Sequence, residues 1–226
     1  DLLVRSDRMN DIFNTHLSKD EILNKSTKLN TPFHYYVIDI KHSTLYLSSN
    51  GINLLNSNSI PAYKGQLFIY NKILSNIQGY NSNKCFILGK KWIYTKNNNT
   101  YSGNNFMEKL GVIDFINYDS EYEEKVLKAI EWVQLMRKDG HGWKLLPKPS
   151  RLELYPNMKN EKDGEWRKIK NELNDKMNDI TSVWMCGFNK RKIAFNNKIF
   201  TWKDKKCNSK NIKFKKSKTS ITLDQI

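Results

Sequence analysis

The chain has 226 residues, of which 38% are hydrophobic and 12% aromatic, so it can bury a core and does not fit a disordered protein. Its formal net charge of +15 favours polyanions such as nucleic acid as partners, although a coding bias toward Lys and Asn can produce the same excess. No apolar run approaches the ~20 residues of a membrane span, so we expect no membrane partner.

The first half of the chain predicts an α/β core, because strand-like and helix-like segments alternate along it. The expected elements are a strand at 1–5, a helical excursion over 7–30, two strands or one long bent strand over 33–47, a helix over 61–77 and strands at 85–89 and 92–94. A capping box of Ser18 and Glu21 supports the excursion, and Gly79 provides a helix end. We assign residues 1–110 to this core.

The second half predicts a mainly helical extension over residues 111–202, followed by a basic tail over residues 203–226. The expected elements are a strand at 112–116, helices over 121–137 and 164–179, and a final strand at 182–186. In the second of these helices, the side chains of Trp166, Ile169 and Leu173 are expected to face inward.

Cysteine usage indicates a reducing, intracellular setting, in the cytoplasm or the nucleus. The three cysteines are odd in number and far apart, so they form neither a disulfide framework nor a C-x-x-C metal motif. They are Cys85, Cys186 and Cys207. Three cysteines also argue against a four-cysteine iron–sulfur cluster. The chain has no G-x-x-x-x-G-K-[ST] loop, so we expect no nucleotide cofactor.

A carboxylate and an ammonium group share one face of an otherwise apolar predicted strand within residues 36–42. Strand side chains alternate between the two faces, so Asp39 and Lys41 point the same way. Ile38 and Ile40 are then expected to point into the core. Such a carboxylate can hold a hard divalent cation, and the lysine can orient water or stabilise a pentavalent phosphate. The alternative is a surface ion pair on an edge strand.

The following helix carries Gln66 and Tyr70 at spacing i, i+4, which stacks their polar groups on one helical face. This is the only Gln-x-x-x-Tyr in a chain with four glutamines. Taken alone, the pair fits an ordinary amphipathic helix better than a functional motif.

Together, the strand-borne Asp39-x-Lys41 and the helical Gln66-x-x-x-Tyr70 resemble the RecB-like branch of the PD-(D/E)xK nucleases. That branch carries an acidic residue after a Gly-rich turn, then D/E-x-K on the next strand and Q-x-x-x-Y on the following helix. The resemblance implies an α/β, restriction-endonuclease-like core with a mixed central sheet flanked by helices, here followed by the helical C-terminal extension. It also implies a deoxyribonuclease that hydrolyses DNA with one or two Mg²⁺ or Mn²⁺ ions.

The resemblance assigns roles to individual residues. The implied catalytic residues are Asp39, Lys41, Gln66 and Tyr70, with Lys41 positioning the attacking water. The implied metal ligands are Asp1, Asp39 and the Ile40 carbonyl, with Asp7 as the reserve for the first acid.

Two features depart from the family's pattern. Asp1 and Asp39 are 38 residues apart, so residues 7–30 are expected to be an insertion between neighbouring strands. The family's upstream helix, which supplies a Glu or His, does not precede Asp1. We therefore expect a core without its N-terminal helix, in a fragment of a larger polypeptide or in a complex that carries a helicase.

Other segments are similar to RecB-family proteins encoded by large DNA viruses, so viral encoding is an open alternative. These segments are residues 77–80 with 86–92, 154–158 and 179–184. They carry no implied catalytic role. A second functional interpretation is an inactive nuclease fold that binds nucleic acid or forms a structural part of a larger complex, and cleavage of RNA is a third.

Several side chains are candidate contacts to nucleic acid. The basic candidates are Lys64, His42, Arg191 and Lys192, with the tail as a further phosphate clamp. A neutral surface histidine is the alternative for His42, and a solvated terminus is the alternative for the tail. The aromatic candidates for stacking on unpaired bases are Trp92, Tyr94, Trp143 and Trp202, with burial in the core as the alternative.

Overall fold

The computed structural model describes residues 1–15, 17–214 and 224. The chain divides into two compact units, Asp1–Leu135 and Met136–Ile226, and the first contains the whole sheet. Among the described residues, no helix combines the length and the apolar character that a bilayer span requires. The rest of the predicted tail, residues 215–223 and 225–226, lies outside the described residues.

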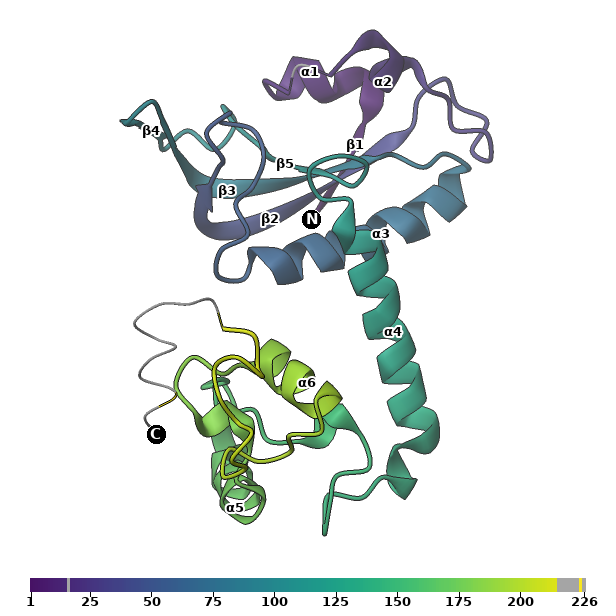
Figure 1. Ribbon diagram of the computed structural model, residues 1–226. Coiled ribbons are helices and arrows are strands. Elements are labelled where there is room, and N and C mark those ends of the chain that lie inside the picture. Colours follow the sequence, from purple (N-terminus) through teal and green to yellow (C-terminus); the bar gives the residue numbers. More distant parts are fainter. Residues whose placement is uncertain (16, 215–223, 225–226) are drawn as a thin grey trace. The chain divides into compact units, whose positions relative to one another are not determined.

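A five-stranded mixed sheet forms the centre of the first unit (Figure 1). Its strands are β1 (Leu2–Arg5), β2 (Tyr35–Tyr46), β3 (Lys84–Lys96), β4 (Asn99–Gly103) and β5 (Gly111–Asp114). β1 pairs antiparallel with β2, β2 pairs parallel with β3, and β3 pairs antiparallel with both β4 and β5. The predicted mixed α/β architecture is confirmed. β3 is one continuous strand where two were predicted, and β5 joins the sheet rather than the helical extension.

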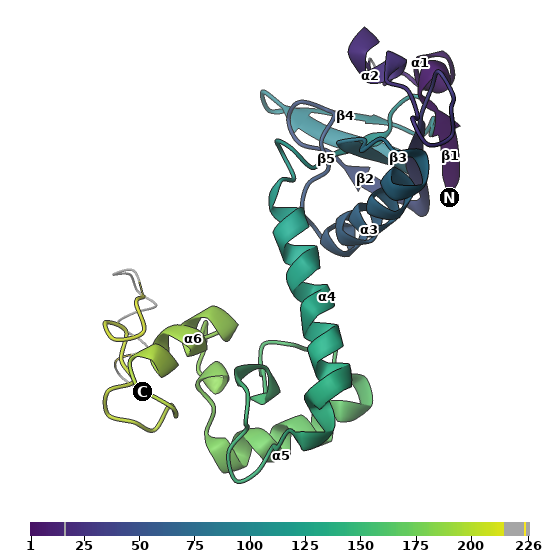
Figure 2. The same cartoon turned by 90° about the vertical axis from the view of Figure 1, so that its right-hand side faces the viewer.

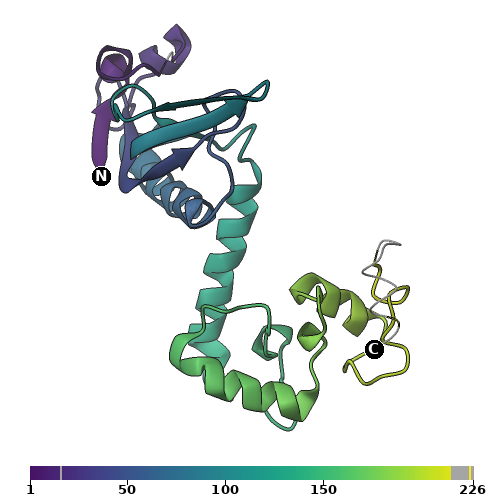
Figure 3. The ribbon, with the colours of Figure 1, turned by 90° about the vertical axis from the view of Figure 1, so that its left-hand side faces the viewer.

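Helices cover both faces of this sheet (Figures 1 and 3). α3 (Ile60–Gln78) lies on one face, and η1 (Ser6–Arg8), α1 (Met9–Ile12) and α2 (Lys19–Leu23) lie on the other. The alternation of strand side chains supplies a separate apolar cluster to each face. Val37, Leu45, Cys85 and Ile87 pack with Leu67 and Leu74 of α3, whereas Tyr36, Ile38, Phe86 and Leu88 pack with Met9, Phe13 and Leu17.

The predicted helical excursion and the predicted helix after it are both confirmed. Ser18 and Glu21 form the capping box of α2. α3 has Pro61 in its first turn and ends at Gly79, whose φ of +70° is the left-handed conformation that glycine adopts without strain.

The side-chain amide of Gln78 ties the end of α3 to the start of β2. Its Oε1 accepts a hydrogen bond from the Tyr35 backbone N–H at 2.8 Å, and its Nε2 donates to the carbonyl oxygens of Tyr35 and Tyr80 at 3.3 and 3.1 Å. The backbone carbonyl of Gln78 accepts from Ser26 Oγ at 2.6 Å and from Lys28 N at 3.1 Å. The buried Gln78 amide therefore pairs with both the backbone N–H and the backbone carbonyl of Tyr35, as the backbone of a neighbouring strand would. This contact fixes the end of α3 against β2.

A buried ion pair fixes the other end of α3. Lys64 and Asp119 are both fully buried, and Lys64 Nζ lies 2.6 Å from Asp119 Oδ1 and donates to the Leu54 carbonyl at 2.8 Å. Asp119 Oδ2 accepts from Asp114 N at 3.1 Å. Burial, reinforced by the Asp119 carboxylate, raises the pKa of the adjacent Tyr122 to about 12. The predicted nucleic-acid contact through Lys64 is wrong, because its ammonium group is enclosed in this network.

A bulge interrupts the β2–β3 pairing directly after Lys41. The pairing register shifts between Lys41 and Thr44. Gly89, the partner of Lys41, leaves room for this irregularity: a Cβ on Gly89 would lie 2.4 Å from Leu45 Cγ and 2.9 Å from the Ser43 carbonyl oxygen. Bulges redirect neighbouring side chains and are frequent beside functional sites.

The regular elements that the structure describes in the second unit are helical (Figure 2). α4 (Glu121–Asp139) runs across the boundary between the units and is followed by η2 (Gly140–Gly142), η3 (Leu152–Leu154), η4 (Gly164–Trp166), α5 (Arg167–Met177), η5 (Ile180–Ser182) and α6 (Phe188–Asn196). The unit's apolar cluster consists of Ile180, Cys186, Ala194, Ile199 and Ile212. Because Ile212 is fully buried, the described start of the predicted tail belongs to the folded unit.

Two predictions for the second unit are wrong. The strand expected at 182–186 is a turn, in which Cys186 N donates to the Val183 carbonyl at 3.1 Å. Trp166 and Ile169, expected to face inward, are 63% and 46% exposed. Neither residue belongs to the apolar cluster of the unit, and α5 has no fully buried side chain.

Arg191 is also unavailable as a nucleic-acid contact, so that prediction is wrong. Its side chain is 1% exposed, and Nη1 donates to the Pro156 carbonyl at 2.6 Å and to both oxygens of Asp179 at 3.3 Å. Asp179 also accepts from Thr181 N at 2.8 Å. The guanidinium group holds together three segments of the second unit.

Gly89→Ala is expected to lower the free energy of unfolding of the first unit by about 1–3 kcal/mol, because the added methyl group would overlap Leu45 and the Ser43 carbonyl. Gly65→Ala is the control. Its Cβ would lie 3.4 Å from Val126 Cγ2, an ordinary contact, and alanine in a helix is more stable than glycine by up to about 1 kcal/mol. Native-state hydrogen exchange of the β2 and β3 amides measures both variants, and equal effects would contradict the account of the bulge.

Lys64→Met is expected to lower the free energy of unfolding of the first unit by about 3–5 kcal/mol, because Asp119 would remain buried without its counter-charge. Lys72→Met, at an exposed position of the same helix, should change it by less than about 0.5 kcal/mol. The same exchange measurement reports both. A Lys64→Met protein that keeps its stability but loses affinity for nucleic acid would reinstate Lys64 as a direct contact.

Candidate metal and nucleic-acid sites

Asp39 and Lys41 lie on the face of β2 that α3 covers. Lys41 Nζ is 2.8 Å from Asp39 Oδ2 and 4.4 Å from the ring centre of Tyr63 on α3. Ile38 is fully buried on the opposite face, as predicted. Ile40 is 49% exposed, so the prediction that it points into the core is wrong. The reason is that the apolar cluster on that face ends at Ile38 along β2.

The Asp39 carboxylate is buried without full compensation. The residue is 1% exposed, and neither carboxylate oxygen has a hydrogen-bond partner among the described residues. Within the described residues its one ion pair is with Lys41, at Oδ2. Removing an ionised carboxylate from water costs several kcal/mol unless charges or donors compensate it, roughly in proportion to how completely it is desolvated. A buried carboxylate oxygen that accepts no hydrogen bond is suited to bind a cation.

Gln66 and Tyr70 interact as their spacing predicts, with Gln66 Nε2 donating to the Tyr70 hydroxyl at 2.6 Å. Together with Tyr63 they form a stripe at spacing i, i+3, i+7 on α3. Because Tyr63 contacts Lys41, this stripe faces the Asp39 side of the sheet. No hydrogen bond among the described residues joins Gln66 or Tyr70 directly to the ion pair on β2.

The register of β1 against β2 aligns Asp1 with Asp39. Leu2 pairs with Ile38, so one further step along both strands brings Asp1 opposite Asp39. Residues opposite each other in antiparallel strands point to the same face, with Cβ atoms ~5 Å apart. The predicted pair of metal-binding carboxylates is compatible with this register.

The reserve acid, Asp7, does not fit the site. It follows the end of β1 at Arg5, which pairs with Tyr35 at the far end of the β1–β2 register from Asp39. Its carboxylate accepts two hydrogen bonds from the Arg5 guanidinium, at 3.0 and 2.7 Å. This ion pair lowers the pKa of the Asp7 carboxyl.

The donor set that the fold offers is therefore Asp39, Asp1 and the backbone carbonyl of Ile40. No group of three or more His, Cys, Asp or Glu side chains gathers within the described residues. A set with two carboxylates suits Mg²⁺, which keeps several of its waters and is usually bound through one or two carboxylates.

Two of the predicted nucleic-acid contacts remain accessible. His42 is exposed and lies in the bulge that follows Lys41. Lys192 is exposed on α6 of the second unit. Trp92, by contrast, is buried in the apolar cluster under α3, and Tyr94 is partly buried against that cluster.

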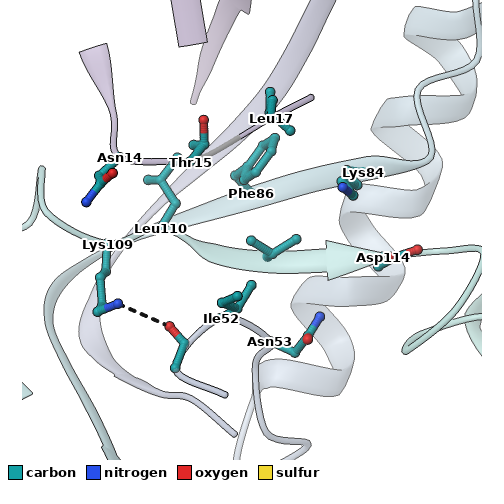
Figure 4. Close-up of a pocket in the computed structure, with 12 residues that line it drawn as sticks. Asn14, Thr15, Leu17, Ile52, Asn53, Lys84, Phe86, Lys109, Leu110 and Asp114 are labelled. Carbon is teal, nitrogen blue, oxygen red and sulfur yellow. Dashed lines mark hydrogen bonds between the residues drawn. The ribbon is translucent and has the colours of Figure 1, made fainter. Parts of the chain in front are cut away.

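A separate pocket of about 270 Å³ lies on the other face of the sheet (Figure 4). Its floor includes Phe86 and Leu110, which belong to the apolar cluster opposite Asp39. Lys84 and Lys109 stand at its two ends, and Lys109 Nζ donates to the Gly51 carbonyl at 3.5 Å. The pocket draws on four segments distant in sequence, so no local pattern predicts it. It is not part of the Asp39 site.

Positive charge is divided unevenly between the two units. Residues 136–226 contain 23 lysines and arginines and 10 aspartates and glutamates, a formal net charge of +13. Residues 1–135 contain 15 lysines and arginines and 13 aspartates and glutamates, a formal net charge of +2. The whole-chain value of +15 conceals this division, which a count by unit reveals. Long-range attraction of a polyanion is therefore a property of the second unit.

The candidate site rests on the geometry of β1, β2 and α3. The resemblance to RecB-like nucleases depends on four residues, Asp39, Lys41, Gln66 and Tyr70. In the structure Asp39 contacts Lys41, and Gln66 contacts Tyr70. No protein-family model, curated protein or solved structure matches the chain.

Proposed function

We propose that this chain is a Mg²⁺- or Mn²⁺-dependent nuclease that hydrolyses DNA, built on a restriction-endonuclease-like sheet of the RecB-like type. One observation carries the proposal: within the part of the chain that the structure describes, the buried Asp39 carboxylate has no hydrogen-bond partner, it lies beside Lys41, and the β1–β2 register brings Asp1 opposite it. A divalent cation would compensate such a group. The chain order also supports the proposal, because β2 leads through the Gln66-bearing helix α3 into the parallel strand β3.

The carboxylates of Asp1 and Asp39, with the Ile40 carbonyl, would hold the ion. When bound, a divalent ion supplies Lewis-acid charge to a phosphate and lowers the pKa of coordinated water. The burial of Asp39 strengthens its attraction for a cation, because few water dipoles compete at that position.

Lys41 is the group that would act on the reacting atoms. Its ammonium lies between the Asp39 carboxylate and the Tyr63 ring, so its position is restricted before any substrate binds. From there it can donate to the attacking water or to a phosphoryl oxygen. Gln66 is a positioning residue in this scheme, and its hydrogen bond to Tyr70 fixes its side chain on the helix face that meets β2.

An inactive nuclease fold that binds nucleic acid is the second candidate. The observation in its favour is the 2.8 Å ion pair itself, because Lys41 already supplies a counter-charge to the Asp39 side chain, which is 1% exposed. In that case the pair has a structural role, and the basic second unit alone would account for binding.

Asp39→Asn and Lys41→Ala are each expected to lower the rate of Mg²⁺-dependent DNA cleavage by at least about 100-fold, because each removes charge from the reacting centre. Asp7→Asn, which removes an acid of the first unit outside the site, should leave the rate within about twofold. Cleavage of labelled single-stranded DNA, duplex DNA and RNA, each with and without EDTA, measures this. Wild-type cleavage rates in both site variants would refute the assignment.

Mg²⁺ at ten times its Kd is expected to raise the free energy of unfolding of the first unit by about 1.4 kcal/mol, and Asp39→Asn should abolish this increase. Thermal melting with a series of Mg²⁺ and Mn²⁺ concentrations measures the effect, with Asp7→Asn as the control. If the wild-type protein does not respond to either ion, the inactive binding module becomes the better account.

A further inference from the structure

Two tryptophans line one pocket of about 320 Å³ in the second unit. Trp184 is 59% exposed, although tryptophan is usually among the more buried residues of a protein. Trp202 forms another part of the lining, and Val183 connects the pocket to the apolar cluster of the unit. The polar lining consists of Asn174, Asp175, Asn178 and Ser182. A pocket of this size and composition accommodates a flat aromatic ring with polar edges.

The turn that carries Trp184 is fixed at both ends. Cys186 is fully buried, its N–H donates to the Val183 carbonyl at 3.1 Å, and Val183 packs against the apolar cluster. Between them, Met185 has a φ of +60°, a conformation that favours glycine. The exposed indole of Trp184 is therefore held on a defined turn and does not belong to a loose loop.

The other lining residues are anchored to the end of α5. The backbone N–H of Trp202 donates to the Asn178 carbonyl at 3.0 Å, and Asn178 caps the C-terminal end of α5 with a φ of +50°. Ser182 Oγ donates to Asn174 Oδ1 at 2.5 Å. These contacts join the turn, the helix end and Trp202 into one lining.

The polar lining favours a ligand with hydrogen-bond donors. It includes the C-terminal end of α5, whose carbonyls carry partial negative charge, and the carboxylate of Asp175. The exocyclic amino groups of adenine, cytosine and guanine are such donors, whereas thymine has no exocyclic amino group. A phosphate group would be repelled at this end of the pocket.

A pocket that contains charged side chains adjoins the first one. It measures about 380 Å³ and shares Val183 and Trp202 with the tryptophan pocket, and its lining includes Lys203 and Lys205. Of its two acids, Asp204 accepts a hydrogen bond from Lys206 N at 2.8 Å. A group that stacks on Trp202 could therefore place an attached phosphate near these lysines.

The second acid of this adjoining pocket also forms hydrogen bonds within the protein. Asp224 accepts hydrogen bonds from the backbone N–H and the hydroxyl of Ser209, both at 2.6 Å. These bonds lower the pKa of the Asp224 carboxyl. They hold the ionised carboxylate against Ser209, and the ammonium groups of Lys203 and Lys205 are the groups of this pocket that attract a phosphate.

We propose that the second unit binds single-stranded nucleic acid, with an unpaired amino-bearing base in the Trp184–Trp202 pocket and its phosphate near Lys203 and Lys205. Aromatic side chains next to basic groups are the arrangement that binds unpaired strands, and the unit's net charge of +13 supplies the attraction to the backbone. This site goes beyond the proposed nuclease activity and does not depend on it.

The test uses the full chain in EDTA, so that cleavage plays no part, and fluorescence anisotropy with a labelled single-stranded DNA 12-mer. Trp184→Ala is expected to weaken the Kd about tenfold, while Trp184→Phe keeps most of the affinity. Trp166→Ala is the matched control, because Trp166 is 63% exposed in the same unit and lines neither pocket. An unchanged Kd for Trp184→Ala would overturn the proposal.

The choice of oligonucleotide separates base stacking from charge. On an abasic 12-mer of equal charge, wild type and Trp184→Ala should bind alike, and a tenfold loss there as well would overturn the proposal. Oligo(dA) and oligo(dC) should bind more tightly than oligo(dT), and the reverse order would contradict the role of the polar lining. Binding of duplex DNA as tight as that of the single strand would also count against a pocket for an unpaired base.

The phosphate contacts have a separate readout. The double substitution Lys203→Ala/Lys205→Ala is expected to reduce the slope of log Kd against log salt concentration by about 2. Lys162→Ala/Lys168→Ala removes the same charge from exposed positions outside both pockets and should change the slope less. Equal changes in the two double variants would show a diffuse attraction and overturn the assignment of these lysines.

Discussion

The burial of one carboxylate, Asp39, is the constraint on which the first unit's proposed function depends. A strand that is otherwise apolar carries this group to the face covered by α3, where Lys41 compensates it only in part. Keeping α3 over that face requires fixed helix ends. The Gln78 amide fixes one end, and the Lys64–Asp119 ion pair fixes the other. The Gln78 side chain and both members of the ion pair are buried polar groups, so the geometry of these contacts is specific in a way that apolar packing alone is not.

The two units differ in the kind of interaction that they can offer. The first has a net charge of +2 and a buried carboxylate suited to a cation, whereas the second has a net charge of +13 and exposed aromatic and basic side chains. Attraction of a polyanion and coordination of a metal ion place opposite demands on local charge. Separating them into two units lets each site keep the charge that its ligand requires.

Local patterns in the sequence predicted the elements that position the site. Alternation placed Asp39 and Lys41 on one face, and spacing joined Gln66 to Tyr70. Predictions that depended on distant partners failed. Lys64 is buried because Asp119, 55 residues away, compensates its charge, and nothing near Lys64 in the sequence reveals that partner. The segment 182–186 has strand-like composition, but Met185 adopts a left-handed conformation and turns the chain. The alignment of Asp1 with Asp39 likewise depends on a strand register that no local pattern contains.

The most direct measurement for the central claim is a crystal structure of the protein with Mn²⁺, using the anomalous signal of the ion to locate it. The account predicts a peak bound to an oxygen of Asp39, with Asp1 as a second ligand and with the Lys41 ammonium moved away from the carboxylate. A structure at saturating Mn²⁺ in which Lys41 stays on Asp39 and no ion contacts that carboxylate would contradict it.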